Sequence, residues 1–371
     1  MRLKKTVAVL LIFGLALAAI AGCGAPPDDE ALPQPSVTAA KAMEGVKIAY
    51  FVSELANPFH QARAAAAQDY AFERYGAEVV IIDGESDNDV MLQNLDMLAT
   101  SNYGGASLQV WHPSGVDASV ISATDAGIAV TSFFGQMGGT GIPAVRNDEA
   151  DAAFALGASA AQQWIKAHPG KIVYTVQLGW PDYPQIRDGR TQPFVEGVLS
   201  VVGEDGMSDL GCIAAETEKE ARDAMTRLLA QNPEVNVIFC EAGGLVSGCM
   251  EVLKEEGRGK MSGGVVQAEI VVGADCSKKD LKEIYNPGSA FKMALGLPPA
   301  STSIAIIDMI AAIYTGEAAQ FPGEERTELV PAFAVDYYSV TLEETLEWYN
   351  KEFLWGVEDA DKLLTVQDVI N

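Results

Sequence analysis

The chain has 371 residues, with 25 lysine and arginine residues against 51 aspartate and glutamate residues and a formal net charge of −26. This excess of negative charge argues against binding to nucleic acid and against electrostatic docking on anionic lipid. The length exceeds what one hydrophobic core usually serves, so two domains are expected.

Residues 1–22 have the three parts of an export signal: a basic start at residues 2–5, an apolar run at residues 6–20, and small residues before Cys23. The apolar run is shorter than the roughly 20 residues that a membrane-spanning helix needs. Residues 20–23 (Ile-Ala-Gly-Cys) resemble the bacterial lipoprotein box, in which the cysteine is acylated and becomes the first residue. The resemblance implies an exported protein that is lipid-anchored to the cell membrane at Cys23, facing the periplasm or the cell exterior. An ordinary cleaved signal or an uncleaved anchor helix is the alternative.

Residues 23–45 are rich in proline, alanine and acidic residues and lack hydrophobic periodicity, which predicts a flexible tether. The remaining cysteines, Cys212, Cys240, Cys249 and Cys276, have no CxxC spacing and no nearby histidine, so no zinc site is expected. Export permits disulfides. Both buried free thiols and a disulfide, for example between Cys240 and Cys276, fit the sequence.

From residue 46 onward, short apolar runs of β-forming residues alternate with helix-length segments, such as residues 60–76, which end at a glycine. Strands that alternate with helical crossovers indicate parallel sheets covered on both faces. The predicted fold class is therefore α/β, with two doubly wound lobes. The strand candidates are residues 46–52, 77–83, 104–111, 128–134, 171–178, 235–240 and 268–275.

The sequence contains no recognisable catalytic motif. The glycine-rich residues 135–141 do not fit GxGxxG, and neither GxSxG nor HExxH occurs. The three histidines, His60, His112 and His168, have no metal-ligand spacing. We therefore expect a protein that is not an enzyme and holds neither a cofactor nor a metal.

The first strand candidate is followed by Ser53-Glu-Leu-Ala-Asn57-Pro58-Phe59-His60 and then by a long helix. This order resembles the opening of the type I periplasmic binding proteins of the ribose- and galactose-binding kind, the substrate-binding proteins of sugar ABC transporters. Ligands of open α/β sheets bind at the carboxyl ends of strands, where this turn would lie. Other segments resemble the family in the same order, up to about residue 340: residues 76–98, 108–118, 127–134, 187–199, 228–257 and the strand that ends in Asp275.

The resemblance implies two lobes that are joined by three crossings and close on a ligand. A monomer of this kind captures a small molecule, a sugar or a sugar-like compound, and delivers it to an ABC permease. A sensor that presents its closed state to a membrane receptor is the alternative, and an enzyme is a third possibility. The expected boundaries are residues 46–147 plus 297–325 for the N-terminal lobe, 148–296 plus 326–345 for the C-terminal lobe, and 346–371 for a C-terminal helical extension.

Sugar recognition combines aromatic faces with polar groups that bond hydroxyls, because a buried polar group without a partner costs about 1–3 kcal/mol. Five positions match the ligand-binding pattern of the family. Ser53, Asn57 and Phe59 match the first turn, Arg190 matches the hydroxyl-binding arginine, and Asp275 matches the aspartate of the second lobe.

Other positions depart from that pattern. His60 stands where a second stacking aromatic residue is usual, and His112 stands where asparagine is common. Phe134 and Gly135 replace an Asp-Arg pair that grips ring hydroxyls, which argues against an ordinary hexose or pentose. Because Phe133 and Phe134 point to opposite faces of a strand, one of them can reach the cleft, and Phe134 is the candidate for ligand contact.

Further candidates lie in the second half of the chain and at the lobe crossing. Residues 241–243, which begin with Glu241, replace an Asn-Asp step, Gly296 replaces a frequent polar residue, and Arg146 is an unexpected cation at the lobe crossing. Trp180 and Tyr183 lie in a loop after a strand, which predicts an exposed aromatic lid over the ligand. Besides a sugar derivative, a nucleobase-like or amine compound fits this set.

Overall fold

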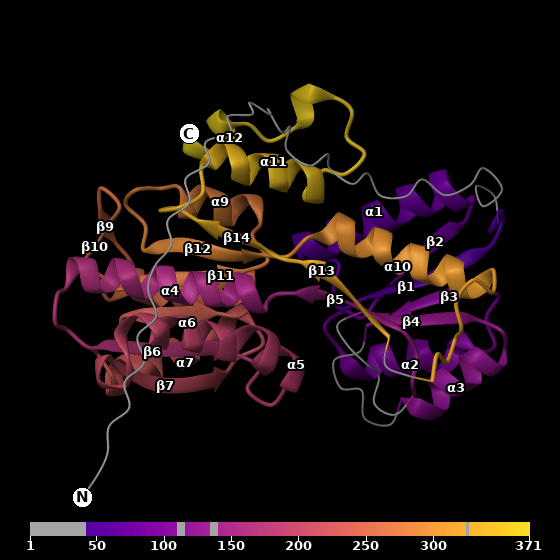
Figure 1. The fold of residues 1–371 in the computed structure, drawn as a ribbon, viewed down its shortest axis with the longest axis horizontal. Helices are drawn as coiled ribbons and strands as arrows, with labels where there is room; N and C mark the ends of the chain where they lie inside the picture. Colours follow the sequence, from indigo (N-terminus) through magenta and orange to yellow (C-terminus); the bar gives the residue numbers. More distant parts are fainter. Residues whose placement is uncertain (1–41, 110–115, 134–139, 324–325) are drawn as a thin grey trace, which may run out of the picture. The chain divides into compact units, whose positions relative to one another are not determined.

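The computed structural model describes residues 42–109, 116–133, 140–323 and 326–371. Cys23, His112 and Phe134 lie outside these residues, as do the predicted signal peptide and most of the predicted tether. The described residues form two mainly parallel sheets with helices on both faces (Figure 1). The predicted α/β class is therefore confirmed. No helix in the described part of the chain is long and apolar enough to cross a membrane.

The first sheet has the spatial order β2-β1-β3-β4-β5-β13 among the described residues. All of its neighbouring strands run parallel. The strands are β1 (Lys47–Val52), β2 (Glu78–Asp83), β3 (Gly105–Leu108), β4 (Ala129–Phe133), β5 (Ala144–Asp148) and β13 (Thr327–Pro331). The four strands predicted before residue 135 lie within a few residues of their expected positions.

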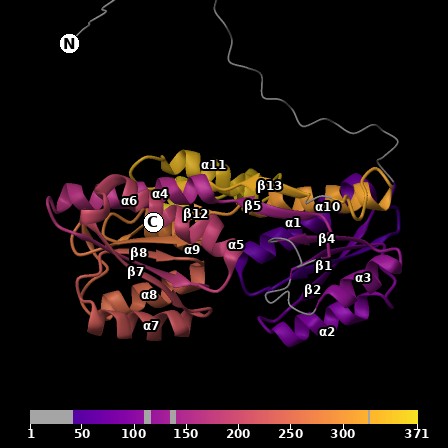
Figure 2. The ribbon, with the colours of Figure 1, turned by 60° about the horizontal axis from the view of Figure 1, so that its bottom comes forward.

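Helices cover both faces of the first sheet (Figure 2). Ile48 and Tyr50 of β1 pack in one core with α1 and α10, and Ala49 and Phe51 pack in another with α2 and α3. This alternation is expected for a strand that is buried on both sides. We call this sheet with its helices the first lobe. The helices are α1 (Pro58–Tyr75), α2 (Asn88–Leu98), α3 (Asp117–Asp125) and α10 (Pro299–Tyr314).

The boundaries of α1 follow from local chemistry. Asn57 precedes the helix, and its side-chain oxygen accepts a hydrogen bond from the backbone N–H of Phe59 at 2.9 Å. Pro58 occupies the first helical position, where the missing N–H costs nothing. Gly76 ends the helix in the left-handed conformation (φ 70°), as glycine does most readily.

The second sheet has the spatial order β7-β6-β8-β11-β12-β14 among the described residues. Its strands run parallel except for β14, which is antiparallel to β12. The predicted strands 171–178, 235–240 and 268–275 correspond to β6, β8 and β11. The bounds are β6 (Val173–Gly179), β7 (Met207–Ala214), β8 (Val237–Cys240), β11 (Ile270–Ala274), β12 (Phe291–Gly296) and β14 (Phe333–Asp336).

Helices also cover both faces of the second sheet (Figure 2). We call this sheet with its helices the second lobe. α4 and α6 pack closely through Gly157 and Gly197, where an added Cβ would overlap the backbone of the other helix. The helices are α4 (Ala150–Ala167) and α6 (Gln192–Val202) on one face, and α7 (Glu218–Gln231), α8 (Gly243–Glu255) and α9 (Lys278–Ile284) on the other. The shorter elements are α5 (Pro184–Ile186), the π-helical turn η1 (Arg187–Thr191), η2 (Glu204–Gly206), β9 (Met261–Ser262) and β10 (Val265–Val266).

The last crossing between the sheets comes later than expected. Residues 326–345 were predicted to lie in the second lobe, but β13 pairs with β5 in the first sheet. Pairing there covers the open edge of β5, which would otherwise leave its backbone groups unpaired. The chain therefore crosses at Ala332, and β14 joins the second sheet as expected.

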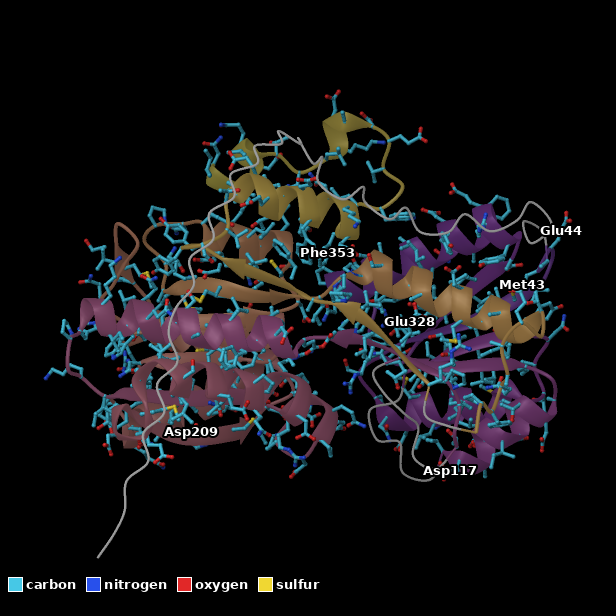
Figure 3. The ribbon with its side chains drawn as sticks, viewed as in Figure 1. Met43, Glu44, Asp117, Asp209, Glu328 and Phe353 are labelled. Atoms are coloured by element: carbon cyan, nitrogen blue, oxygen red, sulfur yellow. The ribbon has the colours of Figure 1, made fainter. Side chains whose placement is uncertain are left out.

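The C-terminal extension consists of α11 (Leu342–Phe353), the short η3 (Ala360–Lys362) and α12 (Val366–Ile370). α11 contacts α1 and α10 of the first lobe. The carboxylate of Glu352 accepts hydrogen bonds from the backbone N and the Oγ of Ser301, near the start of α10, at 2.9 and 2.6 Å. Phe353, labelled in Figure 3, packs on two of the hydrophobic cores. The extension thus contacts both lobes.

The cysteines of the described residues, Cys212, Cys240, Cys249 and Cys276, are free thiols. Cys240, Cys249 and Cys276 are buried and Cys212 is partly buried, so the predicted alternative of buried free thiols holds for three of the four. No disulfide joins Cys240 and Cys276.

Candidate ligand site

The strand order of each sheet reverses once, and candidate side chains lie at both reversals. In the first sheet the reversal lies between β1 and β3, which are followed by Ser53 and Gln109. In the second sheet it lies between β6 and β8, which are followed by Trp180 and Glu241. Ligands of open α/β sheets bind at such reversals, outside the carboxyl ends of the strands. The topology therefore places the candidates where a ligand is expected.

Four buried polar side chains form a hydrogen-bonded network at the first reversal. The Oγ of Ser53 lies 2.6 Å from Nε2 of His60 and 3.3 Å from Nε2 of Gln109. Nη1 of Arg63 lies 2.8 Å from Oε1 of Gln109 and 3.3 Å from Nδ1 of His60. Each of the four is buried, and the Arg63 side chain is wholly so. We call these four residues the first-lobe network.

Aromatic rings surround the guanidinium of Arg63. Its central carbon lies 3.6 Å from the ring centre of Phe133, 5.2 Å from that of Tyr50 and 5.7 Å from that of Phe59. No ion pair among the described residues involves Arg63. Cation–π attraction therefore replaces the carboxylate that a buried arginine usually has. Phe59, predicted to contact the ligand, is buried in this aromatic group.

The charge state of His60 follows from this surrounding. Burial lowers the pKa of His60 well below its usual value, and the charge of Arg63 lowers it further. Burial also lowers the pKa of Arg63, but a guanidinium stays protonated in proteins. The network therefore holds a neutral imidazole beside a fixed cation.

Asn57 links the first turn to the second lobe. Its Nδ2 lies 3.5 Å from Oδ2 of Asp275, and the same oxygen accepts a hydrogen bond from the backbone N–H of Gly243 at 3.2 Å. Asp275 follows β11 in the left-handed conformation (φ 75°), which aspartate tolerates better than most residues. Burial raises the pKa of Asp275, against the opposing charge of Arg190.

Arg190 lies in the π-helical turn η1 and is almost completely buried. Its Nε and Nη2 donate to the two carboxylate oxygens of Glu149 at 2.6 and 2.9 Å, and its Nη1 donates to the backbone carbonyl of Glu241. Burial alone would lower the pKa of Arg190, but the charge and hydrogen bonds of Glu149 raise it. Two N–H groups, one on each terminal nitrogen, remain for other partners.

Glu241 is fully buried beyond the end of β8. Its carboxylate accepts hydrogen bonds from the backbone N–H of Trp180 at 2.8 Å and from the hydroxyl of Thr191. An added Cβ at Gly179 would overlap this carboxylate, so glycine is required there. Burial raises the pKa of Glu241, while its hydrogen bonds oppose the rise. This side chain thus ties β6, β8 and η1 together.

The structure also describes the surroundings of the other candidates. Trp180 was expected in an exposed loop, but its side chain is 6% exposed and packs in the core of the second lobe. Tyr183 is partly buried, and burial raises its pKa to about 12. Arg146 is partly buried in the middle of β5. At Gly296 the space is filled by Trp348 of α11, which an added Cβ would approach to 2.6 Å.

A family model for a periplasmic binding protein domain matches residues 48–318. The chain belongs to this family. No curated protein sequence matches the chain.

Solved structures of sugar-binding and solute-binding proteins share the fold at low sequence identity. GanP, a glucose-galactose binding protein from Geobacillus stearothermophilus, is 16% identical with a TM-score of 0.64, over 81% of this chain and 100% of that chain. A 5-methylthioribose transporter solute binding protein from Thermotoga lettingae is 15% identical with a TM-score of 0.64, over 85% and 93%. An ABC transporter solute binding protein from Agrobacterium vitis, bound with α-D-tagatopyranose, is 15% identical with a TM-score of 0.66, over 82% and 98%.

Within this periplasmic binding protein, Ser53, Asn57, Phe59 and His60 lie together, and so do Arg190, Glu241 and Asp275 in the second lobe. Their contact with a ligand stays a prediction. Arg63, Gln109 and Glu149 were not among the residues predicted from the sequence. Arg63 lies three residues after His60 on the apolar face of α1, a spacing that points to burial. The described residues contain no cluster of three or more metal-ligating side chains.

Proposed function

We propose that this periplasmic binding protein captures a sugar or sugar-like molecule between its two lobes and delivers it to an ABC importer. The observation that carries the proposal is the placement of buried polar side chains at the reversal of both sheets. The hydrogen bond from Asn57 to Asp275 supports it, because it joins residues that follow β1 and β11. Closing on a solute changes the surface that such a protein presents to its permease.

The chemistry of these side chains suits a hydroxylated ligand. Asp275 has carboxylate lone pairs beyond those used by Asn57 and Gly243, and Arg190 has two N–H groups to donate. Groups of both kinds can make charge-assisted hydrogen bonds to hydroxyls. GanP and the Agrobacterium protein, which share this fold, are described with sugars. A sugar therefore fits the site better than a wholly apolar molecule.

We further propose that the protein acts as a monomer held to the outer face of the cell membrane by a lipid on Cys23. A tether after that residue would keep the lobes close to a membrane permease without affinity for the bilayer. Replacing Cys23→Ala in the producing cells should release the protein from the membrane fraction. Retention of the variant with the membranes would contradict the anchor.

A thermal-shift screen of the purified protein tests sugar capture. The panel consists of D-glucose, D-galactose, D-allose, D-tagatose and 5-methylthioribose. A ligand at 100 times its Kd stabilises the folded state by about 2.7 kcal/mol, so binding should raise the melting temperature. Asp275→Asn should clearly reduce the rise, and the same change at the exposed Asp125 should preserve it. If no sugar raises the melting temperature, the sugar proposal fails.

A second candidate is an amine-bearing solute, favoured by the charges in the second lobe. Three carboxylates, those of Glu149, Glu241 and Asp275, act on the single cation Arg190. Arg190 is held by both oxygens of Glu149, and the contacts of Asp275 are to uncharged N–H groups. D-Galactosamine added to the same screen separates the two candidates. A rise with the amine and none with D-galactose would favour this candidate.

A further inference from the structure

The direction of every hydrogen bond in the first-lobe network can be assigned from Arg63. A guanidinium carries only donors, so each of its partners must accept. Nη1 of Arg63 lies 2.8 Å from Gln109 and 3.3 Å from His60. With two hydrogens on Nη1, one can serve each partner. The facing atoms, Oε1 of Gln109 and Nδ1 of His60, are therefore acceptors.

This assignment fixes what the partners present to Ser53. With Nδ1 as an acceptor, the neutral imidazole of His60 carries its proton on Nε2. With Oε1 turned to Arg63, the amide of Gln109 turns its NH₂ group to Ser53. Nε2 of His60 and Nε2 of Gln109 are 2.6 and 3.3 Å from Oγ of Ser53. Both are donors, so the Ser53 oxygen accepts twice.

A serine hydroxyl has two lone pairs and one hydrogen. His60 and Gln109 use both lone pairs, which leaves the hydrogen to donate. No further hydrogen bond of this hydroxyl occurs within the described ranges. Ser53 directly follows β1 at the reversal of the first sheet, and the turn after it carries Asn57, which reaches Asp275. The unused donor thus lies where a solute is expected.

We propose that Arg63 and Gln109 are positioning residues that orient the hydroxyl of Ser53 as a hydrogen-bond donor to the bound solute. The atom of the solute that meets Ser53 is therefore an acceptor: a carbonyl oxygen, a ring oxygen or a hydroxyl oxygen that accepts. This inference rests on the proposed function. It adds that Arg63 and Gln109 make this part of the site a hydrogen-bond donor, which selects a solute with an acceptor atom there.

The ligand-free protein tests the orientation directly. Long-range ¹H–¹⁵N correlation spectra of histidine-labelled protein report which ring nitrogen carries the proton, and His60→Asn identifies the signal among the three histidines. We expect a single Nε2–H tautomer for His60, and a mixture of tautomers in Arg63→Met, which removes the donors. An Nδ1–H or doubly protonated His60 in the wild type at pH 7 would overturn the proposal.

Gln109→Glu tests the effect on the solute. A carboxylate at this position accepts the hydrogen of Ser53, so that donor no longer faces the solute. The same carboxylate gives Arg63 the buried anionic partner that it lacks, so the melting temperature without sugar should stay level or rise. Affinity for the first sugar of the panel that binds the wild type should fall about tenfold. Damage to the fold would instead lower both the affinity and the melting temperature without sugar.

Two variants complete the experiment. Gln68→Glu adds the same charge at an exposed position of α1 and should keep the wild-type affinity. Ser53→Ala should lose as much affinity as Gln109→Glu, and adding Gln109→Glu to it should cost nothing more, since both remove one donor. Wild-type affinity in Gln109→Glu, or additive losses in the double variant, would overturn the proposal. If no sugar binds the wild type, the proposed sugar function fails, and the tautomer of His60 still decides the orientation.

Discussion

The ion pair between Arg190 and Glu149 gives the sharpest prediction about stability. It is bidentate, at 2.6 and 2.9 Å, with 4% and 10% of the two side chains exposed. Glu149→Gln keeps the shape of the side chain but turns an NH₂ group toward a guanidinium that can only donate. Arg190 then stays buried without the carboxylate that it bonds directly, and only the more distant charges of Glu241 and Asp275 remain. Breaking a buried pair in this way costs about 3–5 kcal/mol, so we expect a loss of that size in the free energy of unfolding.

Urea denaturation at pH 7 measures this loss. Arg187 and Asp188 offer a matched control in the same turn, because they form an ion pair at 2.7 Å with 53% and 57% of the side chains exposed. Asp188→Asn should leave the unfolding midpoint unchanged, since solvent screens that pair. Equal midpoints for Glu149→Gln and Asp188→Asn would refute the reasoning. Arg190→Ala is expected to weaken the fold as well as ligand binding, because it strands Glu149.

Three further changes have expected outcomes. Burial raises the pKa of Asp280 to about 6, so the folded protein binds this proton more tightly than the unfolded chain does. The stability that comes from this proton is present below about pH 4 and is lost as the pH rises through 6. In urea titrations the stability of the wild type relative to Asp280→Asn should fall by up to about 3 kcal/mol over that range, and a constant difference would exclude the shift. Gly157→Ala should lower the free energy of unfolding by about 1–3 kcal/mol because its Cβ overlaps the carbonyl of Phe194, and Gly244→Ala, which meets no atom within 4 Å, should not. Glu352→Gln removes the charge near the start of α10 and should cost about 1 kcal/mol in the same assay; unchanged stability would show that the extension does not hold this helix.

Much of the fold could be predicted because its strands are buried on both faces. Continuous apolar runs such as residues 46–52 identify central strands, and glycine ends such as Gly76 identify where helices stop. β7 has no such signal, since it contains Asp209 and a glycine with positive φ (Gly211, 79°), and its pairing with β6 shifts register. The apolar residues of this edge strand are interrupted at residues 208, 209 and 211, so they form neither a continuous run nor a regular alternation.

The assignment of β13 to a lobe and the composition of the site depended on partners far along the chain. β13 is short and ends in proline, so its sequence does not indicate which sheet it joins. Glu149 lies 41 residues from Arg190, and no local pattern connects them. Gln109 lies 46 residues from Arg63. Residues that match the family were found from their motifs, whereas the residues that hold them in place required the structure.

Isothermal titration calorimetry of the wild-type protein with the five sugars of the panel tests the central claim most directly. We expect at least one sugar to bind saturably with one site per chain. Asp275→Asn and Ser53→Ala should each weaken that binding by at least about tenfold, the effect of losing one buried hydrogen bond. The absence of binding heat for every sugar, or wild-type affinity in both variants, would contradict the account.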